Sequence, residues 1–169
     1  MKLIAANAYK MPFRDDVFDG ALMVRVLHHI EEPQSYFKEL RRVMMHKGTY
    51  VQEYANKVHI KAVIRGVLKR NLSIFSQNPY KHESTINSEG STSEGGGIFY
   101  NFHPKYIKRI LEKTNFKITK KYGCSYLRSP ILKKIFNSEI LMIFEKIMQK
   151  TLSWANISPS IILESVLEK

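Results

Sequence analysis

The sequence predicts an α/β fold, because strand-like and helix-like segments alternate along its N-terminal third. Residues 2–8 and 18–26 are short, mostly apolar runs that are typical of buried strands. A helix is predicted over 33–45, and a third strand over 48–55. The nearly continuous apolar character of 18–26 favours a parallel sheet that is covered on both faces.

The predicted helix has clear boundary signals. Residues 9–17 contain Pro12 and a charged cluster and are predicted as a loop. Pro33 suits the first helical turn, and Gly48 is interpreted as the stop signal after the helix. Apolar side chains recur at helical spacing and are expected to face the core: Tyr36, Phe37, Leu40, Val43 and Met44.

The remainder of the chain continues the alternation. Two further helices are basic or amphipathic and are expected at 57–70 and 130–150, and a polar, Ser- and Gly-rich stretch at 82–97 is expected to be a mobile loop. The pattern also predicts a helix over 103–116, a strand over 116–124 and a final strand over 160–167.

The net charge of +12 is concentrated in the middle of the chain. Residues 61–150 carry seventeen basic and six acidic groups, a net of +11. Such a region is consistent with an anionic partner or with solvated basic faces. Lysines outnumber arginines nineteen to eight, which argues against specific nucleic-acid readout.

Residues 6–51 contain a succession of short motifs that resembles one family. The family pattern is an Asp/Asn-Ala pair, Leu-Pro-Phe, an acidic turn, Phe-Asp, a strand that ends near Leu-His-His, and a helix that closes in Arg-Val-Leu-Lys-Pro-Gly-Gly. Here the corresponding residues are Asn7-Ala8, Met11-Pro12-Phe13, Asp15-Asp16, Phe18-Asp19, Leu27-His28-His29 and 42–48. The chain thus resembles the type 11 class I S-adenosylmethionine-dependent methyltransferases. Residues 102–118, with Asn115 in place of a glycine, and 158–163 also resemble that family.

The resemblance implies a Rossmann-like, doubly wound sheet with S-adenosylmethionine at the carboxyl ends of the strands. It places Asn7 and Ala8 against the adenine, although Asn7 alternatively caps a turn. It places Val24 and Arg25 beside the methionine part, Val24 through its backbone. Arg25 either meets a carboxylate or is solvated. A small-molecule methyl acceptor is expected, and no catalytic residue follows from the motif because the sulfonium is already activated.

The family's strand with a Gly-x-Gly-x-Gly loop, and the acidic residue that holds the ribose, have no counterpart in this sequence. We therefore expect a truncated or split chain whose core lacks the first two βα units and binds the cofactor poorly by itself. A complementing chain that supplies the glycine-rich loop is one possible partner. The expected regions are part of the cofactor core at 1–56 (strands three to five), a helical and flexible substrate cover at 57–102, and the last helix with strands six and seven at 103–169. An amphipathic helix, 130–150, is inserted in the last region.

Individual residues raise two other kinds of site, a metal site and a reactive cysteine. His28-His29 with Glu31-Glu32 invites a metal site, but adjacent histidines point in different directions, so no metal is expected. Cys124 is the sole cysteine and is interpreted as structural or incidental. His59, His82 and His103 are isolated in the sequence and are expected to be ordinary surface or core residues.

Two further functions compete with methyl transfer. One is a non-catalytic partner or degenerate methyltransferase module that completes its sheet with another chain. The other is a peripheral membrane protein that uses 57–70 and 130–150 against anionic lipid. The sequence has no apolar run near the ~20 residues of a membrane span and no evident signal peptide, so a cytoplasmic location is expected.

Overall fold

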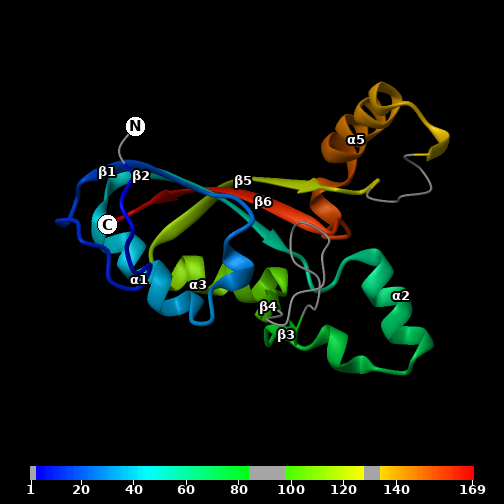
Figure 1. Cartoon of the computed structure of the whole chain (residues 1–169), viewed down its shortest axis with the longest axis horizontal. Coiled ribbons are helices and arrows are strands. Elements are labelled where there is room, and N and C mark those ends of the chain that lie inside the picture. Colours follow the sequence, from blue (N-terminus) through cyan, green and yellow to red (C-terminus); the bar gives the residue numbers. More distant parts are fainter. Residues whose placement is uncertain (1–2, 84–97, 128–133) are drawn as a thin grey trace.

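A four-stranded sheet forms the centre of the protein (Figure 1). The computed structural model describes residues 3–83, 98–127 and 134–169. The strand order is β1-β2-β6-β5. Strands β1 and β2 are parallel, whereas β6 is antiparallel to both of its neighbours. The resemblance implies a seven-stranded sheet of order 3-2-1-4-5-7-6, and these four strands correspond to its 4-5-7-6 half. The bounds are β1 Phe18–Met23, β2 Met44–Ala55, β5 Phe116–Cys124 and β6 Ser160–Leu167.

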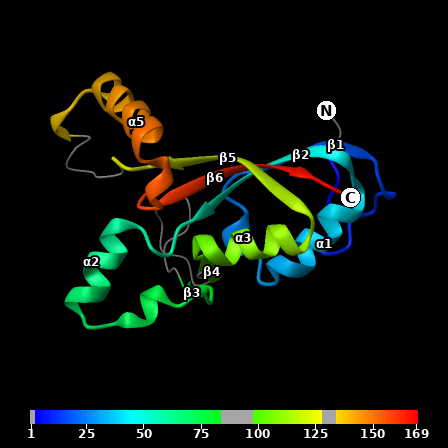
Figure 2. The same cartoon turned by 180° about the vertical axis from the view of Figure 1, so that it is seen from behind.

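Helices lie on both sides of this sheet but at different ends. Helices α1 and α3 cover one face, and both views show them on the same side (Figures 1 and 2). Helices α2 and α5 project from the opposite end, where a small antiparallel sheet of β3 and β4 also lies. The bounds are α1 Pro33–Val43, α2 Ile60–Leu68, α3 Pro104–Lys113, α5 Ser138–Leu152, β3 Tyr80–Glu83 and β4 Ile98–Asn101, with short helices η1 Leu27–His29, η2 Leu72–Phe75 and η3 Ser153–Ala155.

Aromatic rings fill the space between the sheet and α1. The ring centroids of Phe37 and Tyr50 are 5.9 Å apart, and those of Tyr50 and Phe116 are 5.7 Å apart. All three side chains are at most 1% exposed. The hydroxyls of Tyr36 and Tyr50 lie 3.4 Å apart. The predicted inward face of the helix is confirmed, because all five predicted apolar side chains are buried. Large rings bury the most apolar area and dominate such a core.

The strand over 18–26 is shorter and more exposed than expected. It ends at Met23, and Leu22 is 73% exposed. The prediction of a strand buried on both faces was wrong, because only Met23 of β1 is buried. No helix of the described residues covers this part of the second face in Figure 2, so the alternate residues of β1 remain open to solvent.

The expected strand at 2–8 is absent from the described residues of that segment. Residues 3–6 have no regular structure, and Leu3 and Ile4 are 85% and 59% exposed. A strand needs a neighbour to pair its backbone groups, and none of the described strands pairs with this segment. The apolar pattern alone was therefore insufficient.

The end of α1 also differs from the prediction. The helix ends at Val43, and β2 begins directly at Met44. Gly48 is not the stop signal, because it lies inside β2. A Cβ at this position would lie 3.1 Å from the carbonyl oxygen of Asp19 in the neighbouring strand. Its role is to let two strands approach closely.

The side chain of Arg42 contacts the loop over residues 9–17. Its guanidinium donates to the carbonyl oxygens of Met11 and Phe13 at 3.1 and 2.8 Å, and pairs with Asp15 and Glu39 at 2.6 and 2.7 Å. These bonds fasten the predicted loop 9–17 onto α1.

The last part of the chain follows the prediction at its strands and departs from it at one helix. The strands at 116–124 and 160–167 are confirmed. Helix α5 begins at Ser138, because the side chain of Asn137 caps it by accepting from the backbone N–H of Glu139. Residues 130–133 of the expected helix and most of the expected loop at 82–97 lie outside the described residues. Residues 82–83 belong to β3, which was not expected.

Among the described helices, none combines the length and the apolar character that crossing a bilayer would require.

Candidate functional site

The carboxyl ends of the two parallel strands meet at one edge of the sheet. Short helix η1 follows β1 there, and strand β4 lies against it through ring contacts. In open α/β sheets, ligands bind beyond the carboxyl ends of the strands, where polar side chains and free backbone groups gather. A ligand site is therefore expected at the same end of this protein.

A pocket of about 450 Å³ opens at this end. Its walls come from the segment after β1, the end of β2, the small sheet β3–β4 and the start of β6. The lining residues are Arg25, His28, Glu53, Tyr54, Ala55, His82, Phe99, Asn101, Ser125 and Ser160. We call it the β1–β2 pocket. Segments far apart in the sequence therefore combine a cation, a carboxylate and two imidazoles around one cavity.

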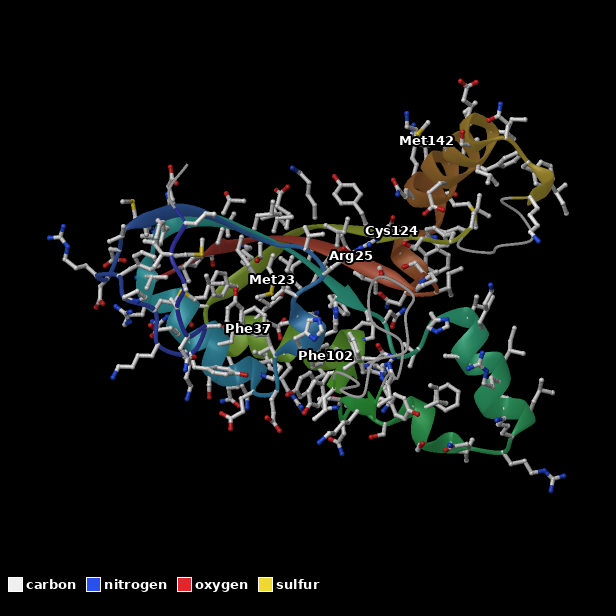
Figure 3. The ribbon with its side chains drawn as sticks, in the orientation of Figure 1. Met23, Arg25, Phe37, Phe102, Cys124 and Met142 are labelled. Atoms are coloured by element: carbon white, nitrogen blue, oxygen red, sulfur yellow. The ribbon has the colours of Figure 1, made fainter. Side chains whose placement is uncertain are left out.

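Arg25 is held in an unusual backbone conformation at the mouth of this pocket. Its φ of 56° lies in the left-handed region, which a non-glycine residue seldom occupies without a structural reason. Figure 3 shows Arg25 and Cys124 near the same end of the sheet. Val24, the residue before it, is 50% exposed and does not line the pocket. The structure thus brings Arg25, but not Val24, into the site.

Asn7 and Ala8 lie outside the β1–β2 pocket. The side-chain oxygen of Asn7 accepts from the backbone N–H of Tyr9 at 2.8 Å, so Asn7 caps a turn. The hydroxyl of Tyr9 in turn accepts from the backbone N–H groups of Glu31 and Glu32 at 3.1 and 3.3 Å. Tyr9 therefore ties this segment to the loop that follows η1. Sequence reasoning had missed Tyr9, since a lone tyrosine carries no motif.

A cluster of rings surrounds Phe99 of β4. The ring centroids of His28, His29 and His82 lie 5.3, 4.8 and 5.8 Å from that of Phe99. His82 was expected to be isolated, but the pairing of β3 with β4 places it opposite Phe99. No spacing in the sequence could have revealed this contact, because β3 and β4 are separated by residues 84–97.

The imidazole of His28 is neutral at physiological pH. Burial, together with the nearby charges of His29, Arg25 and His82, lowers its pKa to about 4. A neutral imidazole offers an unprotonated ring nitrogen, which can accept a hydrogen bond or a proton. His28 therefore presents an unprotonated ring nitrogen, which can accept a hydrogen bond from a ligand in the pocket.

Cys124, His59 and His103, which were expected to be structural or ordinary residues, have structural environments. Burial raises the pKa of the Cys124 thiol to about 11, and its Sγ donates to the carbonyl of Ser160 at 3.6 Å, so it is no nucleophile. The Nδ1 atoms of His59 and His103 accept from backbone N–H groups at the starts of α2 and α3. Within residues 3–83, 98–127 and 134–169, no three His, Cys, Asp or Glu side chains are grouped to hold a metal ion.

Comparison with known proteins agrees with this architecture. Residues 1–52 match a family model described as a methyltransferase domain. An uncharacterized protein of Methanocaldococcus jannaschii is 28% identical over 139 residues, which are 80% of this chain and 54% of that protein. The chain therefore spans about half the length of this curated relative.

Solved structures show the same fold at low identity. A SAM-dependent methyltransferase of Methanosarcina mazei superposes with a TM-score of 0.58 at 16% identity, over 96% of this chain and 65% of that one. One from Thermotoga maritima gives 0.56 at 14%, over 96% and 62%. The [4+2]-cyclase SpnF gives 0.52 at 13%, over 98% and 56%. The fold thus carries more than one kind of chemistry.

Proposed function

We propose that the chain, whose residues 1–52 match a methyltransferase-domain family model, belongs to the type 11 class I S-adenosylmethionine-dependent methyltransferases and takes part in methyl transfer to a small-molecule acceptor. The observation that carries the proposal is the β1–β2 pocket, in which Arg25, His28 and Glu53 converge at the carboxyl ends of the parallel strands. A cavity with a few convergent polar groups at this position is the usual form of a ligand site.

The residues present fit part of S-adenosylmethionine. Arg25 is a permanent cation that suits the methionine carboxylate. The oxygen of Asn7 is used by its turn, which leaves the Nδ2 group to donate to the adenine edge, beside Ala8. Val24 offers backbone groups next to Arg25. The described residues include no glycine-rich strand–loop for the ribose and the remaining backbone contacts. We propose that such a segment, packed beside β1, completes the cofactor site.

The protein's part in the reaction would be to position the two reactants. S-adenosylmethionine, when bound, would supply a methyl group that its sulfonium already activates. Arg25 would hold the methionine carboxylate, and the β1–β2 pocket would hold the acceptor with its oxygen or nitrogen toward the methyl group. The unprotonated ring nitrogen of His28 would accept a hydrogen bond from the acceptor's O–H or N–H group, and the proton would leave to water. Glu53 lines the same pocket and can accept a hydrogen bond from the acceptor.

The test uses the tagged protein purified from its own cells, so that any segment that completes the site is retained. S-adenosylmethionine with an isotopically labelled methyl group is incubated with this protein and the small-molecule fraction of the cells. Label should pass into a small molecule. Replacing Arg25 by Ala removes one charge-assisted hydrogen bond and should raise the KM for S-adenosylmethionine about tenfold or more.

Arg41→Ala is the matched control, because Arg41 is an exposed arginine on α1 and lies outside the pocket. It should leave transfer unchanged. If neither label transfer nor cofactor binding is detected in protein from its own cells, methyl transfer is rejected. The alternative of a non-catalytic partner would then lead, and the open edge at β1, with Leu22 73% exposed, favours that alternative.

A further inference from the structure

A second pocket, of about 350 Å³, lies between α2 and the segment that follows it. We call it the α2 pocket. Three cations and one imidazole line it: Lys57, Arg65, Lys69 and His59. Its other lining residues are small, polar or apolar, and no Asp or Glu is among those that the structure describes. The cavity is therefore strongly electropositive, whatever the charge elsewhere on the surface.

Lys57 is the most telling of these residues. It is only 5% exposed, and its Nζ donates to the backbone carbonyls of Ser76 and Asn78, both at 2.9 Å. These acceptors are neutral, and in the described part of the chain no carboxylate lies within ion-pair distance of Lys57. Burial lowers the pKa of this ammonium. A buried cation is costly unless an anion compensates it.

The imidazole of His59 offers a further donor. Its Nδ1 accepts from the backbone N–H of Ala62 at 3.4 Å and caps the start of α2. In a neutral ring whose Nδ1 is an acceptor, the proton is on Nε2, which can donate to an anion. Burial and the charges of Arg65 and Lys61 lower the pKa of His59, so the neutral form prevails.

Helix α2 and its C-cap residue add two like charges on one side of the pocket. Arg65 and Lys69 are four residues apart, so they lie on the same helical face and repel each other in the absence of an anion. Gly66 lies between them, and a Cβ at this position would approach the side chain of Ile74 to 3.0 Å. The glycine thus lets α2 pack closely on η2 and shapes the pocket wall. Lys61, on the same helix, does not line the pocket.

We infer that the α2 pocket binds a phosphate group. A phosphate carries up to two negative charges and several acceptor oxygens, which matches a buried ammonium, an imidazole N–H and two exposed cations around one cavity. The phosphate belongs either to a soluble phosphate ester or to a lipid headgroup. Neither methyl transfer nor S-adenosylmethionine is needed for this binding.

The position of the pocket links it to the candidate site. Asn101 lines both the α2 pocket and the β1–β2 pocket. A phosphate-bearing acceptor anchored in the α2 pocket could therefore extend past Asn101 into the β1–β2 pocket. This extension, a phosphorylated methyl acceptor, rests on the proposed function, whereas phosphate binding itself does not.

The experiment measures thermal unfolding of the full chain in sodium phosphate or phenyl phosphate, against sodium chloride of equal ionic strength. At about ten times the Kd, phosphate should raise the midpoint by about 3–6 °C over chloride. Lys69→Met should weaken phosphate binding about tenfold or more. Lys61→Met removes the same charge from the same helix outside the pocket and should bind phosphate like the unchanged protein.

A second arm identifies the source of the phosphate. Co-sedimentation with phosphatidic acid vesicles, against phosphatidylcholine vesicles, tests a lipid headgroup, and the two lysine variants are compared again. Binding in either arm that Lys69→Met weakens and Lys61→Met preserves supports the inference. Equal shifts in phosphate and chloride with no vesicle binding overturn it, as does an equal loss in both variants. None of these readouts depends on methyl transfer, so a failure here leaves the proposed function standing.

Discussion

The ring of His28 stacks on that of Phe99, with 5.3 Å between their centroids and 19° between their planes. His28 follows the parallel strand β1, whereas Phe99 belongs to the small sheet of β3 and β4. The contact joins the main sheet to the small sheet at the β1–β2 pocket. Because His28 is kept neutral there, the stability of the protein should depend on its protonation.

The first prediction concerns pH. The pKa of His28 is about 4 in the folded protein and near 6.5 in the unfolded chain, so the unfolded state binds more protons between these values. Stability is complete above about pH 6.5 and decreases as the pH falls toward 4. Urea unfolding at pH 7 and pH 5.5 should show a lower free energy at pH 5.5. His28→Phe should reduce this difference, and an unchanged difference would contradict the assignment.

Asn56 joins the end of β2 to the turn before β6. Its Nδ2 donates to the carbonyls of Asn156 and Ser158 at 2.6 and 2.8 Å, and it is 1% exposed. Asn56→Ala leaves both carbonyls without this donor and should lower the free energy of unfolding by about 2–3 kcal/mol. Asn115→Gly is the control, because Asn115 is exposed with φ at 63° and glycine adopts this conformation readily. If urea titrations showed an equal loss of unfolding free energy in both variants, the role assigned to Asn56 would be wrong.

Gly123 in β5 has no room for a side chain. A Cβ there would overlap the hydroxyl of Tyr126 and lie 2.7 Å from Oγ of Ser158. Gly123→Ala should destabilise the protein by about 1–3 kcal/mol. In Gly20→Ala the new Cβ would lie 3.7 Å from the carbonyl of Thr49, an ordinary contact, so the change should stay within about 0.5 kcal/mol. Thermal unfolding of both variants measures these two effects. If Gly20→Ala destabilised the protein more than Gly123→Ala, the close packing around Gly123 would be contradicted.

The exposed edge at β1 should promote self-association. Leu22 is 73% exposed on an edge strand, and such edges are templates for pairing with another chain. Leu22→Lys should raise the concentration at which light scattering detects aggregates, severalfold. Leu68→Lys adds the same charge at a 79% exposed leucine of α2, away from the edge. If it improves solubility as much as Leu22→Lys, then added charge, and not the edge, is responsible.

Local patterns were sufficient where burial alternates regularly. The strand Ser160–Leu167 has strictly alternating burial, and its predicted bounds agree with the structure. The α1 face was predicted correctly because Pro33 marks its start and large apolar residues recur at helical spacing. Asn115 occupies the position of the family glycine with φ at 63°, a conformation that asparagine tolerates.

The candidate site was only partly predictable. Arg25 was found from the motif and lines the pocket, whereas Glu53, His82 and Phe99 carry no motif and were missed. They meet His28 only because β2 runs parallel to β1 and because β3 pairs with β4. Such contacts depend on strand pairing between distant segments, which a reading of neighbouring residues does not contain.

The sequence by itself determined the α/β class, the family resemblance and most strands of the central sheet, since these follow from periodicity and short-range motifs. Tertiary structure decided which apolar segments are buried. Residues 3–6 are as apolar as a strand, yet they remain exposed because no described strand pairs with them. It also decided that Lys57, one lysine among nineteen, lies buried among basic neighbours. Burial depends on what the rest of the chain places around a residue, and the residue's own type does not specify it.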